Sequence, residues 1–170
     1  MRLPLYLALV LMLTSCGYHL VGQGESAVIP EGVTSASLEA TPNALGKTLL
    51  ADLRIQWLQR ESLLSLESGG GKHHVVLRIE NPSEAFTPVS FDASGLAIQY
   101  RLSVSGSLNM YQNNSLIWQS GLVTSSADIF GDASALTNNP ASIEAEREAL
   151  KEQMYQQWAQ DVLARLQSGF

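Results

Sequence analysis

Cys16 is the residue whose possible chemistry is most clearly defined, because it is the single cysteine of this 170-residue chain. It follows Met1-Arg2 and an almost unbroken apolar run over residues 3–13. A positive start, a short apolar core and small residues before the cut are typical of a secretory signal. A transmembrane helix needs about 20 apolar residues, and this apolar run is shorter than that. We therefore predict a signal peptide over residues 1–15.

The segment Leu13-Thr14-Ser15-Cys16 resembles the bacterial lipobox. In that motif the cysteine takes a diacylglyceryl group on sulfur, becomes the new N-terminus and is acylated there. A chance cysteine behind an ordinary signal is the alternative, but secreted proteins that use cysteines structurally carry them in pairs. A buried thiol of a cytosolic domain is excluded, because a soluble fold would not solvate residues 1–15. We predict that Cys16 is lipidated.

The lipid on Cys16 also predicts a location. One acyl chain holds a protein to a bilayer only marginally, whereas a triacylated cysteine gives a stable anchor. Gly17 stands where lipoproteins retained at the inner membrane usually carry aspartate. The expected location is therefore the outer membrane, on its periplasmic side.

The composition argues against nucleic acid as a partner. The formal net charge is −6, and it becomes about −7 when Arg2 leaves with the signal peptide. An acidic chain without a cluster of Lys and Arg lacks the donors that neutralise phosphates. The sequence predicts no nucleic-acid binding.

The chain also lacks the common motifs of catalysis. It contains no G-x-S-x-G elbow, no H-E-x-x-H and no phosphate-binding glycine loop. His73 and His74 are neighbours on a predicted strand, so they point to opposite faces and cannot hold one metal together. The simplest interpretation makes them exposed polar residues. We expect a non-enzymatic protein with no metal and no cofactor other than the covalent lipid on Cys16.

Residues 16–32 are predicted to form a lipidated N-terminus and tether, because residues 22–32 are small, polar and rich in glycine. Residues 33–170 suit one domain with one core.

A weak alternation over 33–38 predicts a first strand. Thr41-Pro42 then predicts a helix start, with threonine as N-cap and proline at the first helical position. Apolar residues recur every four positions from there, at Leu45, Leu49, Leu53 and Trp57. This spacing predicts a helix of about 17–25 residues.

Three strand segments follow the triple glycine at 69–71. The first covers 74–80 and is expected to bend or break at Asn81-Pro82-Ser83. Strict alternation over 97–110 predicts a long strand with one buried face and one wet face rich in serine. A turn at 112–115 leads into an antiparallel return strand over about 116–126.

A loop is predicted over 127–138, and a last helix after Asn139-Pro140. The apolar stripe of that helix comprises Leu150, Met154, Trp158, Val162 and Leu166. The order β-α-β-β-β-α predicts an α+β fold, in which a small four-stranded sheet is covered on one face by two helices. The strand–helix–strand connection favours one parallel pair, so the sheet is expected to be mixed.

These features together resemble the lipopolysaccharide-assembly lipoprotein family, LptE. The features are Cys16-Gly17-Tyr18-His19-Leu20, the helix, the serine-rich strand, its return strand and the last helix, which ends Val162-Leu163-Ala164-Arg165-Leu166. The resemblance covers residues 16–166 and implies a small sheet with two helices on one face, in agreement with the pattern of elements.

The resemblance implies a function that no local motif supplies. Family members are plugs inside the lumen of the outer-membrane β-barrel LptD, which they help to fold, and they help to place lipopolysaccharide in the outer leaflet. The serine, glutamine and asparagine side chains of the wet face suit a polar barrel interior. The alternative is a stand-alone, periplasm-facing lipoprotein that binds a lipid or a peptide.

Basic residues suited to lipid phosphates, which some members carry, are replaced here by Phe91-Asp92 and Thr137-Asn138. Arg78 and Arg101 remain on wet strand faces. They are candidates for phosphate contacts with lipopolysaccharide or for contacts with the barrel.

Apolar residues outside the predicted core supply further candidates for barrel contacts. They are Phe91 and the pair Ile129-Phe130, which lies in the predicted loop and is expected to be exposed.

Overall fold

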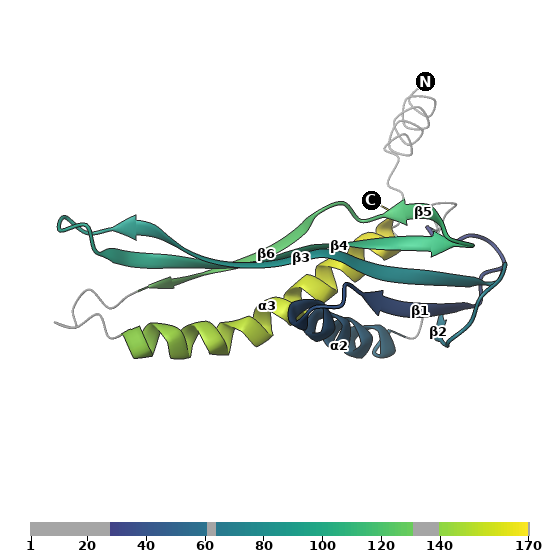
Figure 1. Ribbon diagram of the computed structural model, residues 1–170, viewed down its shortest axis with the longest axis horizontal. Helices are drawn as coiled ribbons and strands as arrows, with labels where there is room; N and C mark the ends of the chain where they lie inside the picture. The colour runs from purple at the N-terminus through teal and green to yellow at the C-terminus, as the bar shows by residue number, and fades with distance from the viewer. Residues whose placement is uncertain (1–27, 61–63, 131–139, 170) are drawn as a thin grey trace, which may run out of the picture.

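The computed structural model describes residues 28–60, 64–130 and 140–169. Within them a six-stranded mixed sheet is covered on one face by two helices (Figure 1). The strands are β1 (Ser35–Ala40), β2 (Ser65–Leu66), β3 (His74–Phe91), β4 (Ala97–Gln112), β5 (Ser115–Gln119) and β6 (Val123–Phe130). The helices are α2 (Ala44–Leu58) and α3 (Pro140–Ser168). The α+β class and the two helices are confirmed, whereas the prediction of four strands was wrong.

The sheet has the order β2-β1-β3-β4-β5, and β6 pairs with β4 as well. β1 lies parallel to β3, as the strand–helix–strand connection predicts, and β3 lies antiparallel to β4. β5 pairs with the last residues of β4 and β6 with the first part, both antiparallel. The predicted return strand is therefore two strands that follow one another beside β4.

The two extra strands have separate physical causes. β2 has only two residues, too few for a period-two pattern to be visible in sequence. The return strand is interrupted at Ser120 and Gly121, where glycine adopts a φ of +66°. Ser120 bridges the interruption: its N–H donates to the Leu108 carbonyl, and its hydroxyl accepts from the Leu108 N–H at 2.9 Å.

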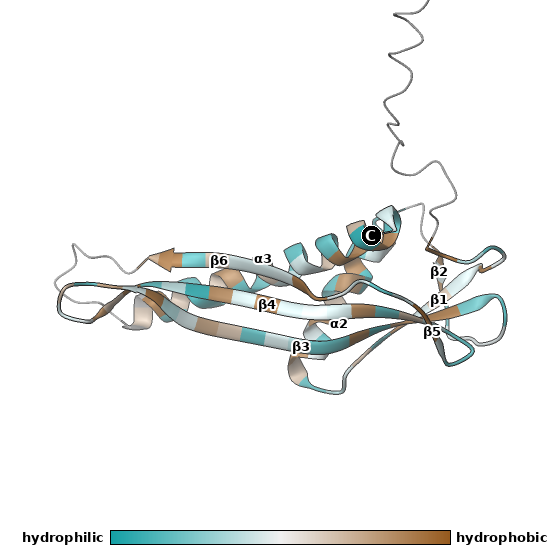
Figure 2. Cartoon of the chain, turned by 90° about the horizontal axis from the view of Figure 1, so that it is seen from above, coloured by the Kyte–Doolittle hydropathy of each residue, from teal (hydrophilic) through white to brown (hydrophobic). Residues whose placement is uncertain are grey.

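The two central strands extend beyond the helices as a hairpin (Figure 1). Hydrophilic and hydrophobic residues alternate along them (Figure 2). β3 was expected to end or bend near residue 81, and it bends without ending. A bulge between Glu80 and Ser83 shifts the register with β4, and Asn81 takes a φ of +52°. Pairing then continues to Phe91.

The first helix starts two residues later than Thr41-Pro42 predicts. The Thr41 N–H and hydroxyl both donate to the Ile79 carbonyl, so Thr41 still continues the pairing of β1 with β3. The N-cap is Asn43, whose side-chain oxygen accepts the Gly46 N–H at 2.6 Å.

The core lies between the sheet and the helices, as the apolar stripes predict. Leu49, Leu53 and Trp57 of α2 are buried. α3 contributes Met154, Trp158, Val162, Leu163 and Leu166, and the sheet contributes Val75, Leu77, Ile79, Leu102, Val104, Leu108 and Met110. Each such side chain contributes about 1.5–3 kcal/mol on burial.

The described end of the predicted tether contacts this domain. Val28 and Ile29 are half-buried and pack against the core. The carbonyl of Gly32 lies 2.6 Å from the His73 Nδ1 atom. Residues 28–32 are thus attached to the domain surface.

Candidate functional site

The face of the sheet turned away from the helices carries a block of short polar side chains. Three rows of paired residues form it across β3, β4 and β6. The rows are Ser83–Ser105–Thr124, Ala85–Ser103–Ser126 and Thr87–Arg101–Asp128. We call these nine residues the hydroxyl face. It confirms the wet face predicted for the long strand, and it extends that face over both neighbours.

The bulge at Asn81 decides which β3 residues join the hydroxyl face. With unbroken alternation, Glu84 would share the face of Glu80. The extra residue pairs Ser83 with Ser105 and Glu84 with Val104, so Glu84 turns toward the helices. One inserted residue therefore keeps a carboxylate off the hydroxyl face and places it over α3.

Arg101 lies at one end of the hydroxyl face and is bonded to a carboxylate. Its Nε and Nη2 atoms donate to the two oxygens of Asp128 at 2.7 and 3.0 Å. Gln99 donates to the same carboxylate at 3.0 Å. The hydrogen bond from Arg101 lowers the pKa of Asp128 below its ordinary value. The guanidinium is thus already engaged with an acid in the chain.

Arg78 is engaged in the same way. Its Nε and Nη2 atoms donate to Glu39 on β1 at 3.1 and 2.9 Å. Its guanidinium also lies 5.0 Å from the centre of the Tyr111 ring. A phosphate at either predicted arginine would have to displace a carboxylate that is already bonded there.

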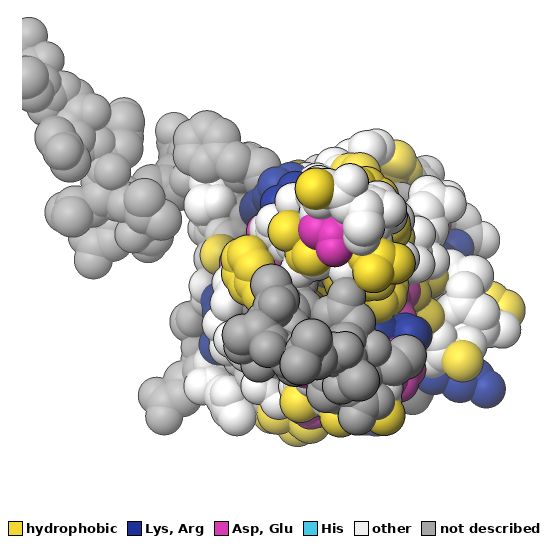
Figure 3. Space-filling model, turned by 90° about the vertical axis from the view of Figure 1, so that its left-hand side faces the viewer, with side chains coloured by type: hydrophobic (Ala, Val, Ile, Leu, Met, Phe, Trp, Pro, Cys, Tyr) yellow, Lys and Arg dark blue, Asp and Glu magenta, His cyan; other side chains and the backbone are white. Residues whose placement is uncertain are grey.

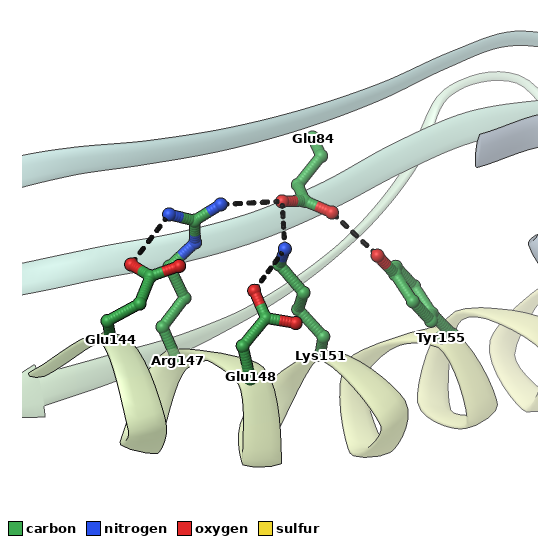
Figure 4. Close-up of polar contacts among 6 residues, drawn as sticks. All are labelled: Glu84, Glu144, Arg147, Glu148, Lys151 and Tyr155. Atoms are coloured by element: carbon green, nitrogen blue, oxygen red, sulfur yellow. Dashed lines mark hydrogen bonds and ion pairs between the residues drawn. The ribbon is translucent and has the colours of Figure 1, made fainter. Parts of the chain in front are cut away.

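A second polar cluster, centred on Glu84, joins β3 to α3 (Figure 4). Tyr155 donates its hydroxyl to Glu84 at 2.6 Å. Lys151 and Arg147 approach the other carboxylate oxygen at 3.4 and 3.7 Å. Burial and the bond to Glu84 both raise the pKa of Tyr155, so its hydroxyl stays a donor. The cluster holds the first half of α3 to β3.

This cluster was not predicted from the sequence. The signal that would have revealed it is Asn81-Pro82, because a bulge there exchanges the faces of all later residues in the strand. When the alternation of faces is shifted by one residue after Asn81, Glu84 and Phe86 lie on the side of the sheet that faces the helices. Phe86 indeed stacks on Tyr100 with ring centres 5.0 Å apart, and its ring also contacts Arg147.

The tip of the β3–β4 hairpin is apolar and exposed. Val89, Phe91 and Leu96 are 42%, 56% and 59% exposed. The turn between them is held by Asp92, whose carboxylate accepts from the N–H groups of Ser94 and Leu96 at 2.8 and 2.9 Å. Hydrophobic side chains gather at this end of the molecule (Figure 3).

Phe130 and Ile129 occupy opposite sides of β6. Phe130 is 67% exposed and remains a candidate for contact with a partner. Ile129 is fully buried, so its prediction as an exposed loop residue was wrong. The cause is that β6 continues to residue 130, and pairing with Tyr100 turns Ile129 inward.

The described residues were compared with the needs of a metal site and of a membrane-spanning helix. Within them, no three His, Cys, Asp or Glu side chains are grouped to hold a metal. His74 is buried, contrary to expectation, and its two ring nitrogens are satisfied by the hydroxyls of Ser35 and Ser37 at 2.9 and 3.1 Å. No helix among those residues is both long and apolar enough to cross a bilayer. The predicted lipidation site, Cys16, lies outside the described residues.

A family model described as lipopolysaccharide-assembly, LptE, matches residues 33–166 of the chain. A search of curated proteins with the chain found no match.

Solved structures of lipoproteins share the fold at low sequence identity. Lipoprotein B from Nitrosomonas europaea superposes with a TM-score of 0.64 at 15% identity, covering 89% of this chain and 90% of that one. A minor lipoprotein from Acinetobacter baumannii gives 0.62 at 14%, covering 81% and 93%. Rare lipoprotein B from Shewanella oneidensis gives 0.56 at 17%, covering 76% and 91%.

Proposed function

The chain belongs to the LptE family of lipopolysaccharide-assembly proteins, and from this premise we propose that it plugs the LptD β-barrel of the outer membrane. As a non-enzymatic lipoprotein anchored through Cys16, it fills the barrel lumen from the periplasmic side. It helps the barrel to assemble and promotes the insertion of lipopolysaccharide into the outer leaflet.

The hydroxyl face is the observation that carries the proposal. A sheet face that remains exposed to water usually carries long charged side chains, which also discourage association. Here the nine positions hold six hydroxyl side chains, one alanine and one arginine–aspartate pair that is already bonded. Such a flat and nearly neutral surface suits close contact with the polar wall of a barrel lumen.

The apolar tip and Phe130 support the same role. Both are exposed: the tip lies at the end of the β3–β4 hairpin that projects beyond the helices (Figure 1), and Phe130 pairs with Gln99 nearer to the helices. Exposed apolar groups at the end of a projecting hairpin are typical of protein contacts. Lipopolysaccharide contacts through Arg78 and Arg101 remain secondary, because Glu39 and Asp128 already bind the two guanidinium groups.

Substitution in the middle of the hydroxyl face tests the proposal. Ser103→Lys introduces a long charged side chain where close contact is proposed. The affinity-tagged full chain is purified in mild detergent, and co-purifying LptD is quantified. We expect the variant to retain less than about one tenth of the wild-type LptD, because burying an unpaired charge costs several kcal/mol.

Gln153→Lys is the matched control, since Gln153 is exposed on α3 and the substitution adds the same charge there. It should leave the LptD yield unchanged. Equal LptD recovery with Ser103→Lys would contradict the plug role. A wild-type chain that purifies without any barrel would favour the stand-alone lipoprotein instead.

A further inference from the structure

The outer edge of β1 is open for most of its length. β2 pairs only with Ser35 and Ala36 of β1. The last hydrogen bond between the two segments runs from the Glu67 N–H to the Ala36 carbonyl at 3.0 Å. Within the described part of the chain, no strand lies beside β1 after that point. An unpaired strand edge presents peptide groups that can bind another strand.

The register shows which peptide group is exposed at that edge. The Ser35 N–H donates to the carbonyl of His73, just before β3, and the Thr41 N–H donates to that of Ile79 in β3. The N–H and carbonyl groups of the odd-numbered residues of β1 therefore point toward β3. In a parallel ladder alternate residues bond to opposite sides. The N–H and the carbonyl of Leu38 therefore point outward, and no hydrogen bond to either is found among the described residues.

A groove of about 320 Å³ lies at this edge. Leu38, Leu50 and Leu66 supply apolar side chains to it, and Arg54 of α2 lies at the same groove. Glu67 also lines it, but its carboxylate accepts the Ser65 hydroxyl at 3.1 Å. Across the described residues, Arg54 has no ion pair or side-chain hydrogen bond, so its guanidinium is free to bind an acid.

We propose that this groove binds an extended, acidic polypeptide segment, which adds to the sheet beside Leu38 where β2 ends. Its backbone bonds the N–H and the carbonyl of Leu38, one apolar side chain enters the groove, and a carboxylate pairs with Arg54. Main-chain bonds at a sheet edge supply affinity, and side-chain pockets supply specificity.

A lipid chain is a poorer occupant than a peptide. An acyl chain would cover the leucines but would leave the peptide groups of Leu38 buried without partners, at a cost of about 1–3 kcal/mol each. A peptide strand satisfies both groups and reaches Arg54. The inference does not depend on the plug role, because β1 and α2 lie outside the hydroxyl face.

Two synthetic heptapeptides test the inference. One is Thr-Val-Thr-Asp-Val-Thr-Val and the other carries Asn in place of Asp. The full-length lipoprotein in detergent micelles is titrated with each, and the exchange of the Leu38 amide is followed by NMR. In the free protein this amide should exchange fast, and the acidic peptide should slow it at least about tenfold. The Asn peptide should bind about twofold to fivefold more weakly, because an exposed ion pair contributes up to about 1 kcal/mol.

Two substitutions connect the effect to the site. Arg54→Gln should remove the difference between the peptides, whereas Lys47→Gln, an exposed position on the same helix, should preserve it. Leu38→Pro should abolish binding. It removes an outward N–H at an edge position that tolerates proline, so the sheet itself loses no bond to β3.

The inference is overturned if the Leu38 amide is already protected without peptide, or if neither peptide slows its exchange. Equal binding of the two peptides by the wild-type protein would also overturn it. Should Leu38→Pro fail to fold, the comparison of Arg54→Gln with Lys47→Gln still decides the outcome.

Discussion

At the scale of single residues, four cations of this protein are paired with acids rather than presented to a ligand. Arg78, Arg101, Lys151 and Arg147 each contact a carboxylate. Arg54 has no such partner among the described residues. Asp52 differs in another way, because it is an acid buried on the side of α2 that faces α3.

Asp52 makes the stability of the domain depend on pH. Burial, and next the charge of Glu152, raise its pKa from 3.8 to about 6. The folded state thus binds a proton more tightly than the unfolded state, so this stabilising contribution is present below about pH 4 and is lost as the pH rises through 6.

Asp52→Asn removes the titrating charge and should raise the midpoint of thermal unfolding at pH 7.5 but not at pH 4. Circular dichroism melts at several pH values measure it. Glu152→Gln, which removes only the lesser cause, should give a smaller rise at pH 7.5. An Asp52→Asn effect that is the same at both pH values would contradict the assignment.

At the scale of elements, the bulge in β3 determines which side chains meet which partner. Asn81 adopts a φ of +52°, a conformation that glycine and asparagine tolerate and β-branched residues do not. The bulge then places Glu84 against α3, where its carboxylate is 21% exposed and contacts Tyr155, Lys151 and Arg147.

Substitution of Asn81 tests the strain at the bulge. Asn81→Val should lower the free energy of unfolding by about 1–2 kcal/mol, whereas Asn81→Gly should change it by less than about 0.5 kcal/mol. Urea unfolding measures both. Ser83→Val is the control for adding a branched side chain nearby, at an exposed position without a positive φ. Equal stability of Asn81→Val and wild type would show that the bulge is not strained.

Substitution of Glu84 tests the connection between β3 and α3. Glu84→Ala should cost about 1–3 kcal/mol, because it leaves the Tyr155 hydroxyl partly buried without its acceptor and removes the less exposed of the two carboxylates that Arg147 and Lys151 each contact. Hydrogen exchange should increase in the first half of α3. Glu144→Ala removes an exposed partner of Arg147, and it should cost less than about 0.5 kcal/mol. An unchanged α3 in Glu84→Ala would contradict the connection.

At the scale of the whole molecule, the sheet is longer than its helical cover. One face of the sheet packs on the helices, the other carries the hydroxyl face, and the hairpin tip extends past both helices (Figure 1). This arrangement leaves a large polar surface and an apolar end available to the same partner. A lipid anchor at Cys16 would limit the search for that partner to the membrane surface.

The anchor and the proposed barrel give separable predictions. In cells without LptD, Cys16→Ala should move the chain from the membrane to the periplasmic fraction, because no lipid then holds it. In cells with LptD, part of the variant should stay with the membrane through the barrel. Fractionation and immunoblotting measure both. Membrane retention of Cys16→Ala without LptD would contradict lipidation as the anchor.

The features that depend on local periodicity could be predicted from the sequence. The stripes from Leu49 to Trp57 and from Met154 to Leu166 predicted the buried helix faces, and the alternation around Ser103 predicted the long strand with its wet face. Such patterns are visible because a helix or strand repeats its environment every few residues. They were sufficient for the α+β class, whereas the family came from the resemblance of the whole chain, which also includes Cys16-Gly17-Tyr18-His19-Leu20.

The features that depend on register and on contacts between distant residues became visible only in the folded chain. The bulge at Asn81 reverses the faces of the rest of β3, and the place of Ile129 depends on its pairing with Tyr100. The partners of Arg78 and Glu84 come from elements 39 and 71 residues away, in Glu39 and Tyr155. A one-residue shift leaves the composition of a segment unchanged but exchanges what it buries and what it exposes. Asn81-Pro82 indicated where regular pairing is interrupted, but not the register that follows it.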